Sequence, residues 1–509
     1  MKTAWLTITV ALASAAIAAG NESAEIGEAS GWEMLGEDTG WLTSRRWQPL
    51  GAEAAMSSSL EGAWQGVLEV AGAKLRLVLK ISTKPDGTLT ATLDSVDQGA
   101  RDIPVDEVTF KGETLRFAIK NLAVMYEGKL SGAEIVGQFK QGGITLPLTL
   151  RKTDKPPEVR RPQTPQKPYP YVEEEVSYEN KKAGVKLAGT LTLPTGKGPF
   201  PAALLITGSG AQDRDETVFG HKPFWVLADY LTRRGIAVLR VDDRGVGGST
   251  GNVAEATSED LAEDVLAGVA YLKGRREINP KRIGLIGHSE GGLIAPIAAS
   301  KSKDVAFIVL MAGTGLTGEE IIYRQSELLL KAHGAHILDI AAQRRVQEKM
   351  FAVVRAEPDN SRAEKKLREI LAEEISQLSE AEKKAAGSAS AALEAQVKEV
   401  LSPWFRFFLT YDPKPTLRKV KCPVLALNGE KDLQVPPQEN LRAIADALKA
   451  GGNRDYTIKE FPGLNHLFQT CQTGAPSEYA QIEETIAPVV LETIASWILQ
   501  RTRRLKFTH

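Results

Sequence analysis

The stretch from Ile283 to Gly292 reads IGLIGHSEGG and places a serine between glycines directly after an apolar run. A short apolar run of this kind is typical of a buried strand. Gly287 to Gly291 then match the pattern G-x-S-x-G, in which the serine occupies a sharp turn between a strand and a helix. The segment that follows, LIAPIAAS, is apolar enough to form a buried helix. This context predicts that Ser289 is a nucleophile.

A serine hydroxyl becomes a good nucleophile only when a base removes its proton and a carboxylate holds that base in the right tautomer. His466, in the stretch FPGLNHLF, follows the serine in chain order and comes just after an apolar run that is typical of a strand. We therefore expect His466 to be the base. The other histidines precede the serine, lie beside it with a side chain expected to point away, occupy a helical insertion or end the chain: His221, His288, His333, His336 and His509.

The acid is expected between the serine and the base, in the stretch LALNGEKDLQVPP. Asp432 stands there four residues past the apolar run, and Glu430 is the rival. Asp432 is favoured because the loop has by then reached the edge of the sheet. The order Ser289, Asp432, His466 is that of α/β-hydrolases.

Hydrolysis of an acyl group also needs N–H donors for the oxyanion. One donor is expected from the residue after the nucleophile, Glu290, and the other from the glycine-rich loop ITGSGAQDRDE. In that loop Ser209 is the preferred donor and Gly210 the alternative. The same loop carries Arg214, which either braces the loop through ion pairs or contacts substrate. The stretch SPWFRFFLTYDP brings aromatic rings that belong either to a core or to a substrate pocket: Trp404, Phe405, Phe407 and Phe408.

Apolar β-rich runs and helical stretches alternate from residue 171 to residue 509, which favours an α/β fold with a mostly parallel sheet and helices on both faces. The first two runs, YVEEEVSYEN and VKLAGTLTLP, are predicted to form an antiparallel pair. About 110 residues rich in Ala, Glu, Lys, Leu and Arg separate VAFIVLMAG from CPVLALNG. This interval is too long for one crossover. We expect an inserted helical cap at about 317–404.

The front half of the chain has a different pattern. Residues 1–18 have a lysine, an apolar stretch and an A-x-A site, which predicts a signal peptide and export to the periplasm or beyond. Residues 19–58 have no clear period. In 59–152 apolar and charged residues alternate between turn signals, which predicts a small antiparallel β domain, a barrel or a sandwich. Residues 153–170 contain six prolines from Pro156 onward and are predicted to form a stiff linker.

The composition limits the possible partners. Lys plus Arg number 63 and Asp plus Glu 64, so no strong field favours nucleic acid or an anionic membrane. After the first residues no apolar run reaches the roughly 20 residues of a membrane span. The two cysteines, Cys422 and Cys471, are expected at opposite strand ends and therefore as free thiols.

From about Tyr171 onward the chain resembles bacterial secreted serine carboxylesterases of the α/β-hydrolase superfamily, through its motifs GSGAQDRDE, GHSEGG, NGEKDLQVPP and GLNHLFQ. The resemblance implies hydrolysis of short- to medium-chain acyl esters, on small molecules or oligosaccharides, without cofactor or metal. The β domain and the cap are departures from the simplest members, and the opening EGAWQGVLEV is similar to the first strand of lipocalin-like barrels. A peptidase or amidase, a carbohydrate deacetylase, and a vestigial scaffold behind a glycan-binding β domain remain alternatives.

Overall fold

The computed structural model describes residues 60–70, 73–98, 100–141, 144–156, 160–380, 383 and 390–502. The predicted signal peptide and the irregular segment 19–58 lie outside the described residues. The described residues form two compact units, a β unit and a larger unit that includes residues 160–377 and 392–502. The larger unit carries Ser289 and is called the catalytic unit below because the candidate residues lie in it. Among the helices of the described part, we find none with the length and apolar character needed to cross a membrane.

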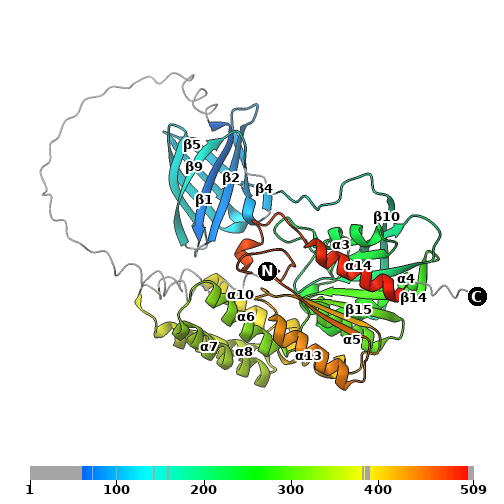
Figure 1. Cartoon of the computed structure of the whole chain (residues 1–509). Coiled ribbons are helices and arrows are strands. Elements are labelled where there is room, and N and C mark those ends of the chain that lie inside the picture. Colours follow the sequence, from blue (N-terminus) through cyan, green and yellow to red (C-terminus); the bar gives the residue numbers. More distant parts are fainter. Residues whose placement is uncertain are drawn as a thin grey trace, which may run out of the picture. The chain divides into compact units, whose positions relative to one another are not determined.

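The β unit is a nine-stranded sheet in the order β4-β3-β2-β1-β9-β8-β7-β6-β5 (Figure 1). All neighbouring strands of this sheet pair antiparallel, as the period-two pattern predicted. Strands β3 and β5 approach each other from opposite ends of this order, so the sheet curls around its apolar face. The strands are β1 Gly62–Val70, β2 Ala73–Thr83, β3 Leu89–Ser95, β4 Ala100–Pro104, β5 Glu107–Lys111, β6 Thr114–Ile119, β7 Val124–Ser131, β8 Glu134–Gln141 and β9 Ile144–Thr153.

The catalytic unit is built on an eight-stranded sheet in the order β10-β11-β13-β12-β14-β15-β16-β17. The pairs β10–β11 and β11–β13 are antiparallel, and the remaining pairs are parallel, so the sheet is mixed with a parallel centre. The predicted hairpin of the first two runs is confirmed. The strands are β10 Tyr171–Asn180, β11 Val185–Pro194, β12 Phe200–Ile206, β13 Ala237–Val241, β14 Ile278–His288, β15 Val305–Met311, β16 Val424–Gly429 and β17 Tyr456–Phe461.

Helices cover both faces of this sheet (Figure 1). One core joins the sheet to α4 Ser258–Lys273, α5 Gly291–Lys301 and α13 Pro437–Ala450. A second core joins the other face to α3 Pro223–Thr232 and α14 Pro488–Thr502. Because both faces are covered, the central strands are apolar throughout, and polar residues are concentrated where the strands end.

A helical insertion lies between β15 and β16, with its own apolar core around Phe351, Leu367, Val400 and Phe405. Its helices are α6 Gly318–Ala332, α7 Ile337–Ala356, α8 Asn360–Ser376, α10 Ser390–Val400 and α11 Pro403–Thr410, followed by the short α12 Lys414–Leu417. The predicted boundary at 404 falls inside α11, which runs on to Thr410 because its apolar residues pack into the core of the insertion.

The second half of the proline-rich segment is fixed to the catalytic unit, unlike a free spacer. Arg161 donates to the carbonyl oxygens of Phe219, Ala480 and Ile482 at 2.7–2.9 Å. Gln163 accepts the N–H groups of Thr485 and Ile486. Proline content alone indicates stiffness, but it does not reveal such side-chain anchors.

Both cysteines are free thiols, as predicted. Burial raises the pKa of the Cys422 thiol to about 12. The thiolate is the reactive form, so this residue is not suited to nucleophilic chemistry at neutral pH.

Candidate active site

Ser289 stands on a strained turn between β14 and α5. Its φ is +53°, in the left-handed region that non-glycine residues rarely adopt. A Cβ at Gly287 would collide with the carbonyl of Gly291, and one at Gly291 with the carbonyl of Ile206. The glycines on both sides therefore allow the close packing that this turn needs. The Ser289 N–H donates to the carbonyl of Met311 at 2.8 Å, which fixes the turn against β15.

His466 and Asp432 come together at the carboxyl ends of β16 and β17. Nδ1 of His466 lies 2.8 Å from Oδ2 of Asp432, and both side chains are buried. The other carboxylate oxygen of Asp432 accepts the N–H groups of Gln434 and Val435 at 2.8 and 2.9 Å. The carboxylate is thus fixed by the backbone on one side and orients the imidazole on the other.

Glu430, the rival acid, occupies a different place. Its carboxylate accepts the N–H of Gly463 at 2.8 Å, in the turn that leads to His466. It therefore braces the loop that carries the imidazole, while Asp432 contacts the imidazole itself.

His288 brings the base close to the turn that carries the serine. The rings of His288 and His466 lie 4.8 Å apart between centroids, and His288 immediately precedes Ser289. Nε2 of His288 lies 3.1 Å from the carbonyl oxygen of His466. The side chain of His288, expected to point away, is therefore held against the loop of the base.

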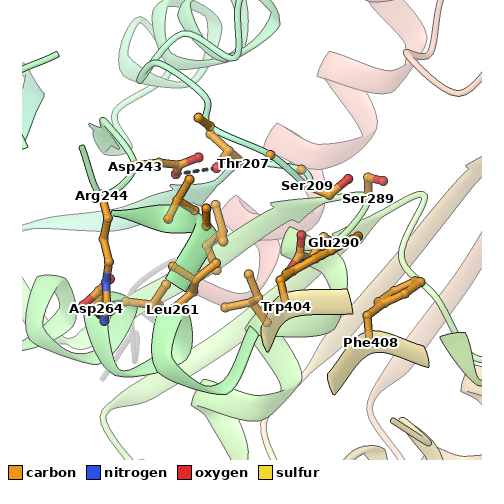
Figure 2. Close-up of a pocket in the computed structure, with 18 of the residues that line it drawn as sticks. Thr207, Ser209, Asp243, Arg244, Leu261, Asp264, Ser289, Glu290, Trp404 and Phe408 are labelled. Atoms are coloured by element: carbon orange, nitrogen blue, oxygen red, sulfur yellow. Dashed lines mark hydrogen bonds and ion pairs between the residues drawn. The ribbon is translucent and has the colours of Figure 1, made fainter. Parts of the chain in front are cut away.

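The glycine-rich loop after β12 lies at the same end of the sheet. Ser209 and Gly210 line a cavity together with Ser289 and Glu290 (Figure 2). In the part of the chain that the structure describes, the backbone N–H of Ser209 has no hydrogen-bond acceptor. The N–H of the preceding residue, Gly208, donates to Oε1 of Glu216 at 2.7 Å, and this hydrogen bond anchors the loop.

Asp243, after β13, holds the same loop from its other side. Its carboxylate accepts the Thr207 hydroxyl at 2.8 Å (dashed in Figure 2) and the Gln212 N–H at 2.9 Å. Burial raises the pKa of Asp243 to about 8, against the lowering effect of these hydrogen bonds and with help from the charges of Glu290 and Glu216. Desolvation disfavours the charged form, so this carboxyl retains its proton to a higher pH than an exposed one.

The cavity has a volume of about 320 Å³ and is bounded by the sheet edge and the inserted helices. The predicted pocket residues Trp404, Phe405 and Phe408 line it, and the rings of Trp404 and Phe408 are stacked 5.3 Å apart. Phe407 stacks on Tyr411 instead. Most of the remaining wall is apolar, so the cavity suits a hydrocarbon group.

Arg214 is not among the residues that line this cavity. Its guanidinium is bound to Asp242 and Glu175, and Asp242 raises its pKa further. Of the two readings of this residue, the geometry supports the bracing one, because a guanidinium held by two carboxylates is already satisfied.

Glu290 connects the nucleophile turn to the inserted helices. One of its carboxylate oxygens accepts the Ser258 hydroxyl and the Trp404 indole N–H, each at 2.7 Å. The sequence analysis predicted a role only for the backbone N–H of this residue. The partner from α11 was not predictable, since it lies more than a hundred residues away.

Two residues of the site were missed by the sequence analysis. Glu216 entered the sequence analysis only as the last residue of the motif GSGAQDRDE, yet it is buried and anchors Gly208. His288 was set aside because of its position in the turn. Glycine spacing and chain order carry no signal for either role. Among the described residues, we find no group of His, Cys, Asp and Glu arranged to hold a metal ion.

Comparison with known proteins agrees with a hydrolase. Residues 183–456 match the sequence model of the X-Pro dipeptidyl-peptidase (S15) family. Esterase EstD of Thermotoga maritima is 28% identical over 332 residues, which cover 65% of this chain and 69% of EstD. The uncharacterized protein YfhR of Escherichia coli O157:H7 is 28% identical over 145 residues, which cover 28% of this chain and 48% of YfhR.

Among solved structures, the Pyrococcus furiosus esterase Pf2001 matches with 18% identity and a TM-score of 0.39, over 67% of this chain and 97% of that one. The family match reaches over more than half of the chain and includes Ser289 and Asp432. The protein is thus a hydrolase of the α/β-hydrolase type and belongs to the X-Pro dipeptidyl-peptidase (S15) family.

Proposed function

We propose that this protein is a serine carboxylesterase that uses Ser289 as nucleophile, His466 as base and Asp432 as the acid that orients the base. The observation that carries the proposal is the buried hydrogen bond of 2.8 Å between His466 and Asp432, at the sheet edge where Ser289 stands on its strained turn. Strained backbone at a buried polar edge is a feature of active sites.

In the proposed reaction the Ser289 hydroxyl oxygen attacks the ester carbonyl carbon while His466 takes the hydroxyl proton. His466 then returns this proton to the departing alcohol, which leaves an acyl group on Ser289. A water molecule, deprotonated by the same imidazole, hydrolyses the acyl-enzyme. Asp432 keeps Nδ1 of His466 protonated, so that the other ring nitrogen is free to act as the base.

The oxyanion formed in each step is proposed to accept the backbone N–H groups of Ser209 and Glu290. In support, Ser209 and Glu290 line the same cavity as Ser289. A backbone donor needs no reorganisation when the charge develops, and the loss of one such donor costs on the order of 10²–10³ in turnover. Gly210 remains the alternative donor in the loop.

The proposed substrates carry short- to medium-chain acyl groups. In support, the cavity is mostly apolar and holds about 320 Å³, and aromatic rings of the inserted helices form one of its walls. An apolar pocket discriminates between acyl groups by about 1–3 kcal/mol per methylene. The esterase name of the Thermotoga maritima relative points in the same direction.

Hydrolysis of p-nitrophenyl acetate and p-nitrophenyl butyrate by the full chain tests this proposal. We expect Ser289→Ala to lower turnover on the order of 10⁶-fold, because triad nucleophiles in other enzymes behave in this way. Ser300→Ala is a matched control, since this serine lies near the end of α5 and its hydroxyl, within the described ranges, bonds only to the helix carbonyl of Ile297. Wild-type turnover no faster than that of Ser289→Ala would refute the proposal.

A peptidase is the second candidate, and the family match favours it. An X-Pro ester and the matching X-Pro p-nitroanilide, tested side by side, separate the two activities. We expect kcat/KM for the ester to exceed that for the anilide by a larger factor than in the uncatalysed reactions. A higher kcat/KM for the anilide than for the ester would establish the peptidase instead, provided that Ser289→Ala abolishes the hydrolysis of the anilide.

A further inference from the structure

The side chains of His288 and Glu216 form a buried pair directly behind the candidate site. Nδ1 of His288 lies 2.9 Å from Oε1 of Glu216, and the two side chains are 4% and 3% exposed. The reaction proposed above uses neither of them. A buried histidine and a buried carboxylate are costly unless each is fully partnered, so their contacts need an explanation.

The partners of His288 define where its protons must be. A backbone carbonyl can only accept, so Nε2, which lies 3.1 Å from the carbonyl oxygen of His466, carries a hydrogen. On the other side, Oε1 of Glu216 already accepts the Gly208 N–H at 2.7 Å. The same oxygen lies 2.9 Å from Nδ1 of His288, so Glu216 joins the Gly208 N–H to the imidazole.

We propose that His288 is a positioning residue, held by the carboxylate of Glu216, that joins the glycine-rich loop of Ser209 to the loop of His466. The chain of contacts runs from Gly208 through Glu216 and His288 to the carbonyl of His466. One end lies next to Ser209, the other is the proposed base itself, and His288 precedes the proposed nucleophile. The inference rests on the proposed function for its kinetic part and on geometry alone for the contacts of His288.

The groups around the His288 ring hold it in one position. The ring lies against Glu216, from the loop after β12, and against His466, from the loop after β17. Asp432 lies on the far side of His466, and the Phe468 ring lies 6.5 Å away at an angle of 63°. His288 is therefore in contact with both loops that it is proposed to join.

The backbone supports the idea that this arrangement is held under strain. Glu216 and Phe468 have φ values of +52° and +61°, both in the left-handed region. Such a conformation is costly for a residue other than glycine and persists only where its surroundings impose it. The hydrogen bonds of Glu216 to Gly208 and His288 hold this geometry from both sides.

Nuclear magnetic resonance of the full chain labelled with ¹⁵N-histidine tests, without any substrate, which ring nitrogen of His288 donates. Signals of His288 are assigned by their loss in His288→Asn. We expect Nε2 of His288 to carry a hydrogen in the wild type, because this nitrogen faces the carbonyl oxygen of His466. A bare Nε2 would overturn the contact that joins His288 to the loop of His466, whether or not the protein hydrolyses esters.

Steady-state kinetics on p-nitrophenyl butyrate, with active sites counted from the acyl-enzyme burst, tests the positioning role. We expect Glu216→Gln to lower kcat per active site by about 10- to 100-fold, because displacements of about 1 Å at catalytic groups cost this much. KM should change less than about threefold, since the pair lines no part of the cavity. A merely structural role would reduce the number of active sites and leave kcat per site unchanged.

Asp213→Asn is the matched control. Asp213 lies in the same loop as Glu216 and accepts the N–H groups of Asp215 and Thr217, but it contacts neither Gly208 nor His288. We expect its kcat per active site to stay within about threefold of the wild type. An equal loss in both variants would attribute the effect to general loop order and overturn the specific role of the pair.

Discussion

The two sheets of this protein bury very different side chains. The β unit fills its interior with apolar residues such as Trp64, Leu79, Leu115 and Ile135. Its buried Tyr126 hydroxyl is satisfied by the carbonyl groups of neighbouring strands. At the carboxyl edge of the catalytic sheet, charged or polar side chains are buried instead, and these bind one another: Glu216, His288, Asp432, Asn465, His466 and Gln469.

Buried apolar side chains and buried polar side chains contribute differently to the free energy of folding. Apolar burial contributes about 25 cal/mol per Å² and needs only shape and size. Buried polar groups contribute little net stability and become costly once a partner is lost. The cluster at the carboxyl edge is therefore the place where the proposed function locates the chemistry, while the apolar interior of the β unit contributes stability.

The largest expected effect concerns the polar edge. Asp432→Asn removes the charge that holds Nδ1 of His466 in its protonated form, while the shape is kept. We expect kcat on p-nitrophenyl butyrate to fall about 10⁴-fold, as such a change does in a serine protease. The measurement is initial-rate kinetics at pH 8, with Glu430→Gln as the matched control, for which we expect a loss below about tenfold. An equal fall of kcat in the two variants would show that Asp432 is not the acid that orients His466.

The second effect concerns the apolar interior. Leu79→Ala, at a fully buried position of β2 opposite Trp64, should destabilise the β unit by about 2–5 kcal/mol. Turnover per active site should stay unchanged, since Leu79 belongs to a separate core. Urea unfolding and burst-normalised kinetics check the two halves of this prediction. Val67→Ala, half-exposed in the same sheet, should change stability by less than about 0.5 kcal/mol. A fall in kcat per active site with Leu79→Ala would show that the core of the β unit affects turnover as well as stability.

The third effect concerns a buried histidine of the polar edge that lines no part of the cavity. His221 binds Thr485 and the carbonyl of Tyr479, and burial, together with the charge of Arg161, lowers its pKa to about 4. Between pH 6.5 and 4 the unfolded chain binds a proton that the folded chain does not, so the free energy of unfolding falls as the pH decreases through this window. The contribution is at most about 3 kcal/mol.

His221→Gln should reduce this acid sensitivity. Urea unfolding at pH 7 and pH 4 gives, for each protein, the change in the free energy of unfolding between the two pH values. We expect this change to be smaller in the variant than in the wild type. His333→Gln is the control, because this histidine is only partly buried and its Nδ1 bonds to a helix carbonyl. An unchanged pH difference in His221→Gln would show that the acid sensitivity arises elsewhere along the polar edge.

Much of the candidate site could be predicted because local patterns carry it. The glycines around Ser289 are required by a turn that a Cβ would block, so they are visible in the sequence. Asp432 and His466 each follow a strand, and parallel strands end at one edge of a sheet, so their meeting could be expected. The partners of Glu290 and Glu216 could not be expected, because hydrogen bonds between distant loops leave no periodic signal.

The elements of both units could be predicted from local patterns, whereas the ends and the anchoring contacts of some segments could not. Period-two alternation predicted the antiparallel sheet, and composition predicted the helical insertion, but not that α11 continues to Thr410. The proline-rich segment was expected to be a spacer, whereas Arg161 and Gln163 tie it to the loop that precedes α14.

The amino-acid sequence alone determined the class of fold, the nucleophile turn and the order of its three candidate catalytic residues, because strand periodicity and steric demands at glycine act over a few neighbouring residues. Only the tertiary structure decided the partners of the two other buried carboxylates: Glu216 for His288 and Glu290 for Trp404. Such pairs form between segments that the packing of the whole sheet brings together. The low dielectric of this packed edge makes a buried polar group costly when its partner is missing, so each pair affects stability.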